Sequence, residues 1–237
     1  MLTLVLGTLY LGWYRWPGWY LSSVLHVVGI VVMVDLVVGP TLTLVVSSRQ
    51  KPSRILARDI AIIVTVQLAA LVYGAVTLWS GRPLYYAFSV NSLDCVQASD
   101  IDASEVALAL RQNPSLAPHW YSLPRWIWAP LPDDPDEAMR IVNSASFGSG
   151  KDVTEMPRYF KPWEQGLPKL RGQLMRLDDI KELNKKEKQY LHIRLAADGL
   201  SPDERNLLIM WGGSRRVVAV FDPATLQIKA LLNPDLA

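Results

Sequence analysis

Residues 21–79 read LSSVLHVVGIVVMVDLVVGPTLTLVVSSRQKPSRILARDIAIIVTVQLAALVYGAVTLW, and this stretch decides the fold. Two long apolar runs, residues 21–46 and 59–79, flank a short loop that is rich in basic side chains. Each run has about 20 residues or more, enough for a helix to cross the ~30 Å hydrocarbon core of a bilayer. The stretch therefore predicts a transmembrane helical hairpin.

The composition of the chain changes after this hairpin. The chain has 237 residues, is 50% hydrophobic and carries a formal net charge of +2. Residues 1–81 hold only seven charged side chains, whereas residues 82–237 have the mixed, near-neutral charge of a soluble domain. A near-neutral domain offers no electrostatic attraction for nucleic acid. We therefore predict a transmembrane region over residues 1–81 and an α+β domain over residues 82–237.

Basic residues in the hairpin loop predict the orientation of the chain. The positive-inside rule places a short loop that carries several lysine or arginine side chains in the cytoplasm. Residues after Trp79 then lie on the opposite side, which is the periplasm for a bacterial inner membrane. The four basic residues of the loop are Arg49, Lys51, Arg54 and Arg58.

The segment before the hairpin is apolar but short. As a helix, residues 1–14 reach only about 20 Å, which is less than a full span. A basic n-region and an A-x-A cleavage site, the marks of a signal peptide, are missing, so we expect a first transmembrane helix that lacks its cytoplasmic beginning. An aromatic cluster around Pro17-Gly18 predicts a tight turn at the outer membrane interface. Its members are Trp13, Tyr14, Trp16, Trp19 and Tyr20.

Two polar side chains are predicted inside the bilayer. Counted from the cytoplasmic helix ends, Asp35 lies about 16 Å deep and Gln67 about 12 Å deep, so the two are at similar depth on adjacent helices. An unpartnered carboxylate is costly there, so the pair either joins the two helices or offers a polar group to a partner protein. Pro40 is expected to kink its helix, and Gly39 and Gly74 allow close helix approach.

Local patterns predict the elements of the outer domain. Asp102 and Glu105 have the spacing of a capping box, and the apolar face of a long amphipathic helix runs from residue 177 to Gly199. The fold class is therefore α+β, with transmembrane helices followed by a domain that ends in an antiparallel β-meander. We expect strands over residues 84–90, 207–211, 217–221 and 226–232, helices over 103–112 and 135–147, irregular structure over 114–132 and a loop over 149–170.

Residue patterns give no indication of catalysis, of a metal or of a cofactor. The three histidines, His26, His119 and His192, have no partner at metal-ligand spacing. The sequence FGSGKD at 147–152 lacks the first glycine and the final Ser or Thr of a phosphate-binding loop. The acidic run at 133–137 is explained by a helix N-terminus rather than by calcium. We expect a membrane-anchored interaction protein that is not an enzyme and needs no cofactor.

The hairpin also carries a family pattern. The pattern is Asp-x-x-x-Gly-Pro-x-x-Thr, a basic turn, Gln-Leu-Ala-Ala-x-x-Tyr-Gly, and then Arg-Pro before an aromatic strand. In these features the chain resembles the TfpX/TfpZ family of type IV pilin accessory proteins, and a Pro-Arg-Tyr sequence at 157–159 extends the likeness more loosely. The matching residues are Asp35, Gly39, Pro40, Thr43, Gln67, Leu68, Ala69, Ala70, Tyr73, Gly74, Arg82, Pro83 and Phe88.

The resemblance implies an inner-membrane protein that stabilises or presents the major type IV pilin before it enters the fibre. The expected partners are the transmembrane helix and periplasmic head of that pilin, together with membrane lipid. Two alternatives remain, a membrane-anchored envelope sensor and a pilin-modifying factor, although neither an output domain nor a catalytic motif is visible. The candidate contact and packing residues are Asp35, Gly39, Pro40, Gln67, Tyr73 and Gly74.

Overall fold

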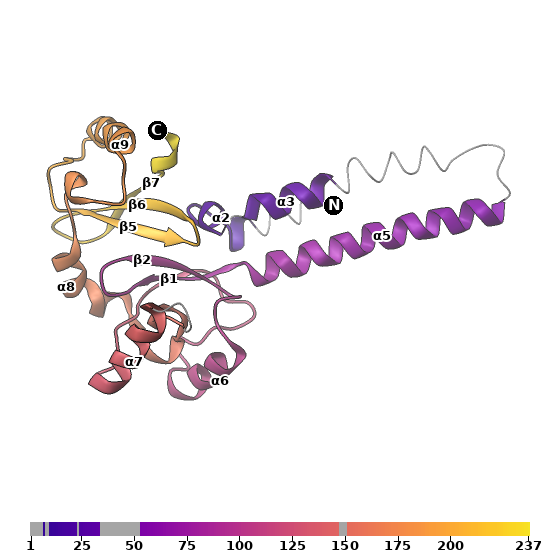
Figure 1. Cartoon of the computed structure of the whole chain (residues 1–237), viewed down its shortest axis with the longest axis horizontal. Coiled ribbons are helices and arrows are strands. Elements are labelled where there is room, and N and C mark those ends of the chain that lie inside the picture. Colours follow the sequence, from indigo (N-terminus) through magenta and orange to yellow (C-terminus); the bar gives the residue numbers. More distant parts are fainter. Residues whose placement is uncertain (1–6, 8–9, 23, 34–52, 147–150) are drawn as a thin grey trace. The chain divides into compact units, whose positions relative to one another are not determined.

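The computed structural model divides the chain into two compact units (Figure 1). The sheet unit comprises Met1–Ser22 and Pro83–Ala237, and the helical unit comprises Ser23–Arg82. Each unit is described by itself below. The structure describes residues 7, 10–22, 24–33, 53–146 and 151–237.

The helical unit contains helices α3 (Val24–Met33) and α5 (Ser53–Ser80), which pack against each other. In the described part of the chain, α5 is the one helix long and apolar enough to cross a membrane, and little of it is buried. The predicted run at 59–79 is therefore a helix that begins earlier, at Ser53. Most of the predicted first span, and the second span beyond Met33, fall outside the described residues.

The sheet unit is built on seven strands in the order β4-β3-β1-β2-β5-β6-β7. Neighbouring strands are antiparallel except for two parallel pairs, β1 with β3 and β2 with β5. The predicted α+β class and the antiparallel C-terminal meander are confirmed. The strands are β1 (Pro83–Phe88), β2 (Leu93–Gln97), β3 (Arg125–Trp128), β4 (Lys161–Pro162), β5 (Leu207–Gly212), β6 (Arg215–Phe221) and β7 (Ile228–Leu232).

Helices cover this sheet and connect its strands. The predicted helix at 103–112 has those bounds in the structure, and the helix predicted over 135–147 is described from Pro135 to Ser146. The helices are α2 (Gly18–Leu21), α6 (Ala103–Gln112), α7 (Pro135–Ser146), α8 (Trp163–Gln173) and α9 (Lys185–Ala197). Short 3-10 turns occupy Val153–Glu155, Pro157–Tyr159, Leu177–Asp179 and Pro234–Leu236.

Two stretches that were predicted to be irregular or loop contain regular elements. Strand β3 lies within the proline- and tryptophan-rich stretch, where Pro124 and Pro130 flank the strand and do not interrupt it. Helix α8 begins inside the predicted loop, although Gly166 and Pro168 are signals against a helix. Gly166 is required there because a Cβ at this position would lie 2.7 Å from the Trp128 side chain.

Two predicted helix starts also differ from the structure. The long helix expected from residue 177 is only α9, whose N-terminus is a capping box between Asn184 and Glu187. The capping box expected at Asp102 does not form, because its carboxylate pairs with Lys151 at 3.2 Å. Glu105 pairs instead with Arg158 at 2.9 Å.

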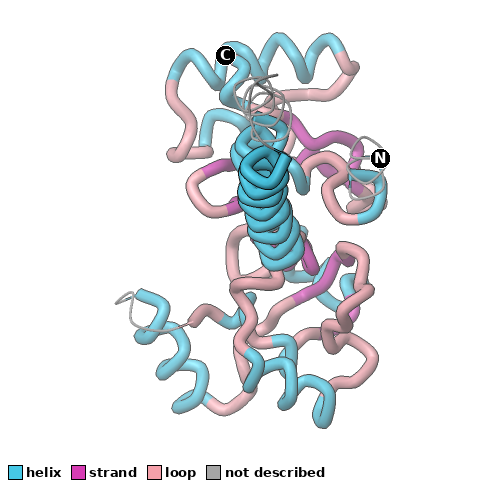
Figure 2. The backbone as a smooth tube through the Cα atoms, turned by 90° about the vertical axis from the view of Figure 1, so that its right-hand side faces the viewer, coloured by secondary structure: helices cyan, strands magenta, loops and turns pink. Residues whose placement is uncertain are grey.

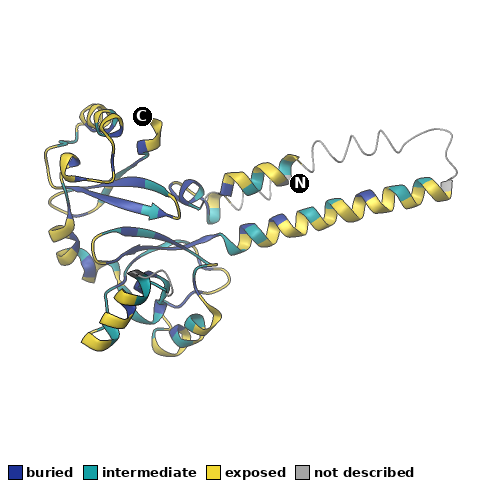
Figure 3. Ribbon diagram, in the orientation of Figure 1, coloured by how far each residue is buried: buried dark blue, intermediate teal, exposed yellow. Residues whose placement is uncertain are grey.

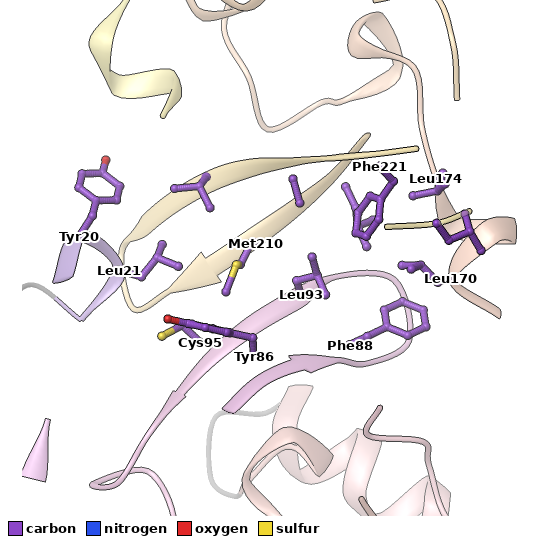
Figure 4. Close-up of a cluster of buried hydrophobic side chains, with 14 residues drawn as sticks. Tyr20, Leu21, Tyr86, Phe88, Leu93, Cys95, Leu170, Leu174, Met210 and Phe221 are labelled. Carbon is purple, nitrogen blue, oxygen red and sulfur yellow. The ribbon is translucent and has the colours of Figure 1, made fainter. Parts of the chain in front are cut away.

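The sheet buries side chains on both faces because successive residues of a strand point to opposite sides. On β6, Phe221 points into one core cluster and Val220 into another. The first cluster gathers side chains from β1, β2, β5 and β6 with α2 and α8 (Figure 4). Cys95 is 6% exposed within it, so the predicted small buried hydrophobe is confirmed.

The other face of the sheet is covered in two separate parts. Ile141 of α7 packs over β1 and β3, whereas Leu191 and Leu195 of α9 pack over β5, β6 and β7. Within the sheet unit, helices lie outside the strands at both ends, as Figure 2 shows. Each half of the sheet thus has its own helical cover.

Candidate partner-binding site

One side of α5 is covered, and its covered positions recur every three or four residues. This spacing places them on a single face of the helix. Figure 3 shows these darker bands along a helix that is otherwise exposed. We call this face the covered stripe. Its members are Leu56, Asp59, Ile63, Gln67, Ala70, Gly74, Thr77 and Leu78.

The structure brings together only some of the predicted site residues. Gln67 and Gly74 both lie on the covered stripe, two helical turns apart. Tyr73 lies off the stripe and is 70% exposed. The predicted residues Asp35, Gly39 and Pro40 fall outside the described residues, so the pairing of Asp35 with Gln67 stays a prediction.

The exposed side of α5 carries a second pattern, which composition alone did not reveal. Small side chains recur there at every fourth position, and Tyr73 occupies the next position of the same row. Rows with this spacing form the ridges by which helices pack, and small residues permit close approach inside a membrane. We call this row the small ridge. Its members, all exposed, are Ala57, Ala61, Thr65 and Ala69.

The two threonine hydroxyl groups near the middle and end of this helix are satisfied within the helix itself. Thr65 donates a hydrogen bond to the carbonyl oxygen of Ala61, and Thr77 donates one to that of Tyr73, each at 2.8 Å. Such bonds to the preceding turn give each threonine hydroxyl a partner inside a membrane. The exposed face of α5 is therefore suited to lipid or to another apolar helix.

The last turn of α5 is closed by an arginine of the family pattern. Nη1 of Arg82 donates a hydrogen bond of 2.5 Å to the carbonyl oxygen of Trp79, and the guanidinium lies 4.3 Å from the centre of the Trp79 ring. A cation at a helix C-terminus is favourable because the last carbonyl groups carry partial negative charge. Arg82 is thus a helix-end residue, and Pro83 starts β1.

The aromatic turn packs into the sheet unit, and its predicted place at the outer membrane interface stays a prediction. Tyr14 is 4% exposed and Tyr20 is 8% exposed. The Tyr20 hydroxyl donates a hydrogen bond to Asp235, while Arg215 donates one of 3.1 Å to the Tyr20 carbonyl oxygen. Burial, with the neighbouring Asp235 carboxylate, raises the pKa of Tyr20 to about 12.

Further contacts join this turn to other parts of the unit. The indole nitrogen of Trp13 donates to the carbonyl oxygen of Ser122 at 2.7 Å, and that of Trp16 donates to Leu231 at 3.1 Å. A Cβ on Gly212 would lie 2.4 Å from the Leu21 Cβ. The aromatic turn can therefore pack this closely against the β5–β6 hairpin only if residue 212 is glycine. Sequence patterns missed this site because each of these partners lies more than 100 residues away in the chain.

The Pro-Arg-Tyr sequence at 157–159 joins two helices of the sheet unit. Arg158 forms its ion pair with Glu105 of α6, and the Tyr159 hydroxyl donates a hydrogen bond to Glu137 of α7. The side-chain amide of Asn113 also donates to the carbonyl oxygen of Pro157 at 3.1 Å. This part of the family pattern therefore stabilises the fold.

One carboxyl group of the sheet unit has an unusual environment. Burial raises the pKa of Asp94 to about 7, and the charges of Asp152 and Glu155 act in the same direction. A hydrogen bond from the Ser92 hydroxyl, at 3.2 Å, opposes this shift. Among the residues that the structure describes, no group of three or more His, Cys, Asp or Glu side chains is arranged to hold a metal ion. That the protein uses no metal stays a prediction.

No protein-family model matches the chain, and no solved structure matches it significantly. A "Fimbrial assembly protein, serogroup E1" of Dichelobacter nodosus is 25% identical over 202 residues, which cover 84% of this chain and 76% of that protein.

Two further proteins of the same organism are similar. The "Fimbrial assembly protein, serogroup I" is 24% identical over 85% of this chain and 77% of its own length. The "Fimbrial assembly protein, serogroups C1 and C2" is 26% identical over 45% of this chain and 81% of its own length. The chain is therefore homologous, over most of its length, to proteins that are named for fimbrial assembly.

Proposed function

We propose that this protein assists the assembly of type IV fimbriae by binding the pilin subunit in the inner membrane before the subunit enters the fibre. The observation that carries the proposal is the homology to fimbrial assembly proteins over 84% of the chain. Helix α5 supports a membrane location, since its span Arg54–Ser80 is long and apolar enough to cross a bilayer and little of it is buried. In this proposal the protein is a binding partner and not an enzyme.

The small ridge of α5 is the proposed contact for the apolar helix of pilin. Lipid and helix are equally apolar, so helices associate in a membrane through close packing rather than through the hydrophobic effect. Ala61 and Ala69 present little side-chain volume, and Tyr73 adds an aromatic contact at the end of the row. The covered stripe, with Gln67 and Gly74, is then used within the helical unit itself.

The proposed orientation puts the sheet unit in the periplasm, where it shields the pilin head. Support comes from the four basic residues of the hairpin loop, which favour a cytoplasmic location for that loop. A reporter active only in the periplasm should work when it is fused after Ala237 and should be silent when fused at Ser48. The opposite pattern would reverse the proposed orientation.

Co-purification of pilin from detergent-solubilised membranes tests the function. Wild-type protein should retain pilin, whereas Ala61→Leu and Ala69→Leu should lose it because leucine keeps the two helices apart. Val64→Leu is the matched control, since Val64 is 54% exposed but points about 100° around the helix from Thr65 at the middle of the small ridge. Its pilin binding should equal that of the wild type.

The possible outcomes test the pilin-binding function and the small ridge as its contact surface separately. If wild-type protein retains no pilin, the binding function is refuted, and the sensor and pilin-modifying alternatives gain weight. If pilin is retained by all variants alike, the small ridge is not the contact surface. Protein levels in the membrane, measured by immunoblot, must be equal for this comparison.

A further inference from the structure

We propose that the sheet unit carries its own lipid anchor, a surface patch that inserts into the headgroup region of the bilayer. The patch consists of exposed side chains from one loop and from the segment before the aromatic turn. Their exposed fractions range from 47% to 72%. We call this surface the aromatic patch. Its members are Tyr10, Leu11, Trp120, Tyr121 and Leu123.

The loop of the aromatic patch is held in a defined turn. The backbone N–H of Ser122 donates to the carbonyl oxygen of His119 at 3.1 Å, and the backbone N–H of His119 donates to the Ser122 hydroxyl oxygen at 2.9 Å. Ser122 is only 9% exposed, whereas its neighbours Tyr121 and Leu123 are 60% and 55% exposed. The turn thus buries Ser122 and displays apolar side chains beside the exposed His119 ring.

A basic residue fixes the start of this loop. The guanidinium of Arg125 donates hydrogen bonds to the carbonyl oxygens of Ser115, Leu116 and Ala117, at 3.1 to 3.3 Å. The His119 ring also stacks on Tyr121, with 5.4 Å between ring centres. These contacts order the loop before any ligand is present, so binding need not first order the backbone.

The two segments of the aromatic patch are neighbours in space. The indole N–H of Trp13 reaches the Ser122 carbonyl oxygen, and a Cβ on Gly12 would lie 3.9 Å from Cδ2 of Leu123. Tyr10 and Leu11 directly precede these residues in the chain. The two segments that carry the exposed apolar side chains are therefore in contact, although they are about 110 residues apart in the chain.

The composition of this surface favours lipid as the ligand. Tryptophan and tyrosine concentrate at membrane interfaces because each combines an apolar ring with a polar group. No Asp, Glu, Lys or Arg occurs in residues 1–14 or 112–124, so no strongly hydrated charge within these segments opposes insertion. By contrast, Ile193 is the one exposed large apolar side chain on the described helix α9, and single exposed apolar residues of this kind are common on proteins.

The inference rests on the proposed membrane insertion of α5. Only Gly81 and Arg82 separate this helix from β1 along the chain, so the sheet unit starts close to the bilayer surface if α5 spans it. A patch that binds headgroups then adds a second attachment, which is favoured by the high effective concentration of lipid.

Site-specific fluorescence on the full-length protein in liposomes tests the anchor. The probe is an environment-sensitive NBD label on Tyr121→Cys, and Trp120→Cys provides a second position in the aromatic patch. The control is Ile193→Cys on α9, since Ile193 is 64% exposed. The native Cys95 is buried, and burial raises the pKa of its thiol, so labelling of the wild type should give only a low background.

We expect NBD emission at both patch positions to shift to shorter wavelength and to be quenched by lipids that carry a nitroxide near the headgroup. Emission at the control position should show neither effect. The anchor is refuted if the patch labels are not quenched, if the control is quenched equally, or if the patch labels respond to added pilin but not to nitroxide lipid.

Pilin co-purification is measured on the same unlabelled variants. Retained pilin with no lipid quenching refutes the anchor alone and leaves the proposed function standing. Lipid quenching at the patch labels, together with a wild-type protein that binds no pilin, refutes the proposed function and leaves the anchor standing.

Discussion

The Tyr20 hydroxyl donates a hydrogen bond to the Asp235 carboxylate, although the two residues are 215 positions apart. Tyr20 belongs to the turn before α3, and Asp235 lies in the 3-10 turn at the C-terminus. The Arg215 guanidinium lies 4.9 Å from the centre of the Tyr20 ring, so the ring is held between β6 and the C-terminal turn. The chain segment that leads into the helical unit is therefore part of the sheet unit.

Removal of this hydrogen bond should weaken the sheet unit slightly. We expect Tyr20→Phe to lower the free energy of unfolding by about 1 kcal/mol, because the ring and its packing remain and only the hydroxyl is lost. Thermal unfolding of the full-length protein in detergent measures the effect. Tyr121→Phe is the control, since that side chain is 60% exposed and its change should have no effect. Equal stability of both variants would show that the bond contributes nothing.

The close approach of Leu21 to the β5–β6 hairpin gives a stronger prediction. Gly212→Ala introduces a Cβ 2.4 Å from the Leu21 Cβ, so the aromatic turn must move away from the hairpin. We expect a loss of about 1–3 kcal/mol, typical of overpacking, and faster proteolysis near residues 13–22.

Gly172→Ala provides the matched control for this substitution. Gly172 lies in α8, and a Cβ there would meet nothing within 4 Å. Because alanine favours a helix over glycine, this variant should be neutral or slightly more stable. A tolerated Gly212→Ala would mean that the turn is not packed on the hairpin.

The half-buried carboxyl of Asp94 predicts a dependence of stability on pH. Its pKa is raised to about 7, whereas an unfolded aspartate titrates near pH ~4. Between these values the folded chain keeps a proton that the unfolded chain releases, so the unfolding free energy should fall as pH rises from about 4 to about 7.

The Asp94→Asn substitution isolates this contribution. The amide does not ionise, so the variant should be more stable than the wild type at about pH 8, and the difference should shrink toward about pH 4. Asp203→Asn, at an exposed position, is the control and should leave the pH profile unchanged. Parallel pH profiles for wild type and Asp94→Asn would contradict the shifted pKa.

The two faces of α5 should respond differently to added volume. Gly74 is buried on the covered stripe, so Gly74→Leu should disturb the packing of the helical unit and lower the amount of protein in the membrane. Ala75 is exposed, and Ala75→Leu should be tolerated. Immunoblots of membrane fractions compare the two, and equal levels would argue against packing at Gly74.

The sequence by itself determined the elements whose signals are local. Helix α6 ends at Gln112, before Asn113-Pro114, and the meander of β5, β6 and β7 follows its turn residues. The start of α9 could also be predicted from the sequence, because Asn184 and Glu187 have capping-box spacing. The apolar pattern that begins at residue 177 led instead to the prediction of a longer helix. These features depend on neighbours within a few residues, and a sequence pattern can therefore predict them.

Only the tertiary structure decided the contacts between distant segments. The parallel pairing of β2 with β5, the helix through Gly166 and the docking of Tyr20 and Leu21 each depend on partners that no local pattern identifies. At Gly166 and Gly212 the same glycine that signals a loop in the sequence permits close packing in the fold. On α5, hydropathy predicted an apolar helix, but packing within the helical unit decided which side is covered and left Tyr73 exposed.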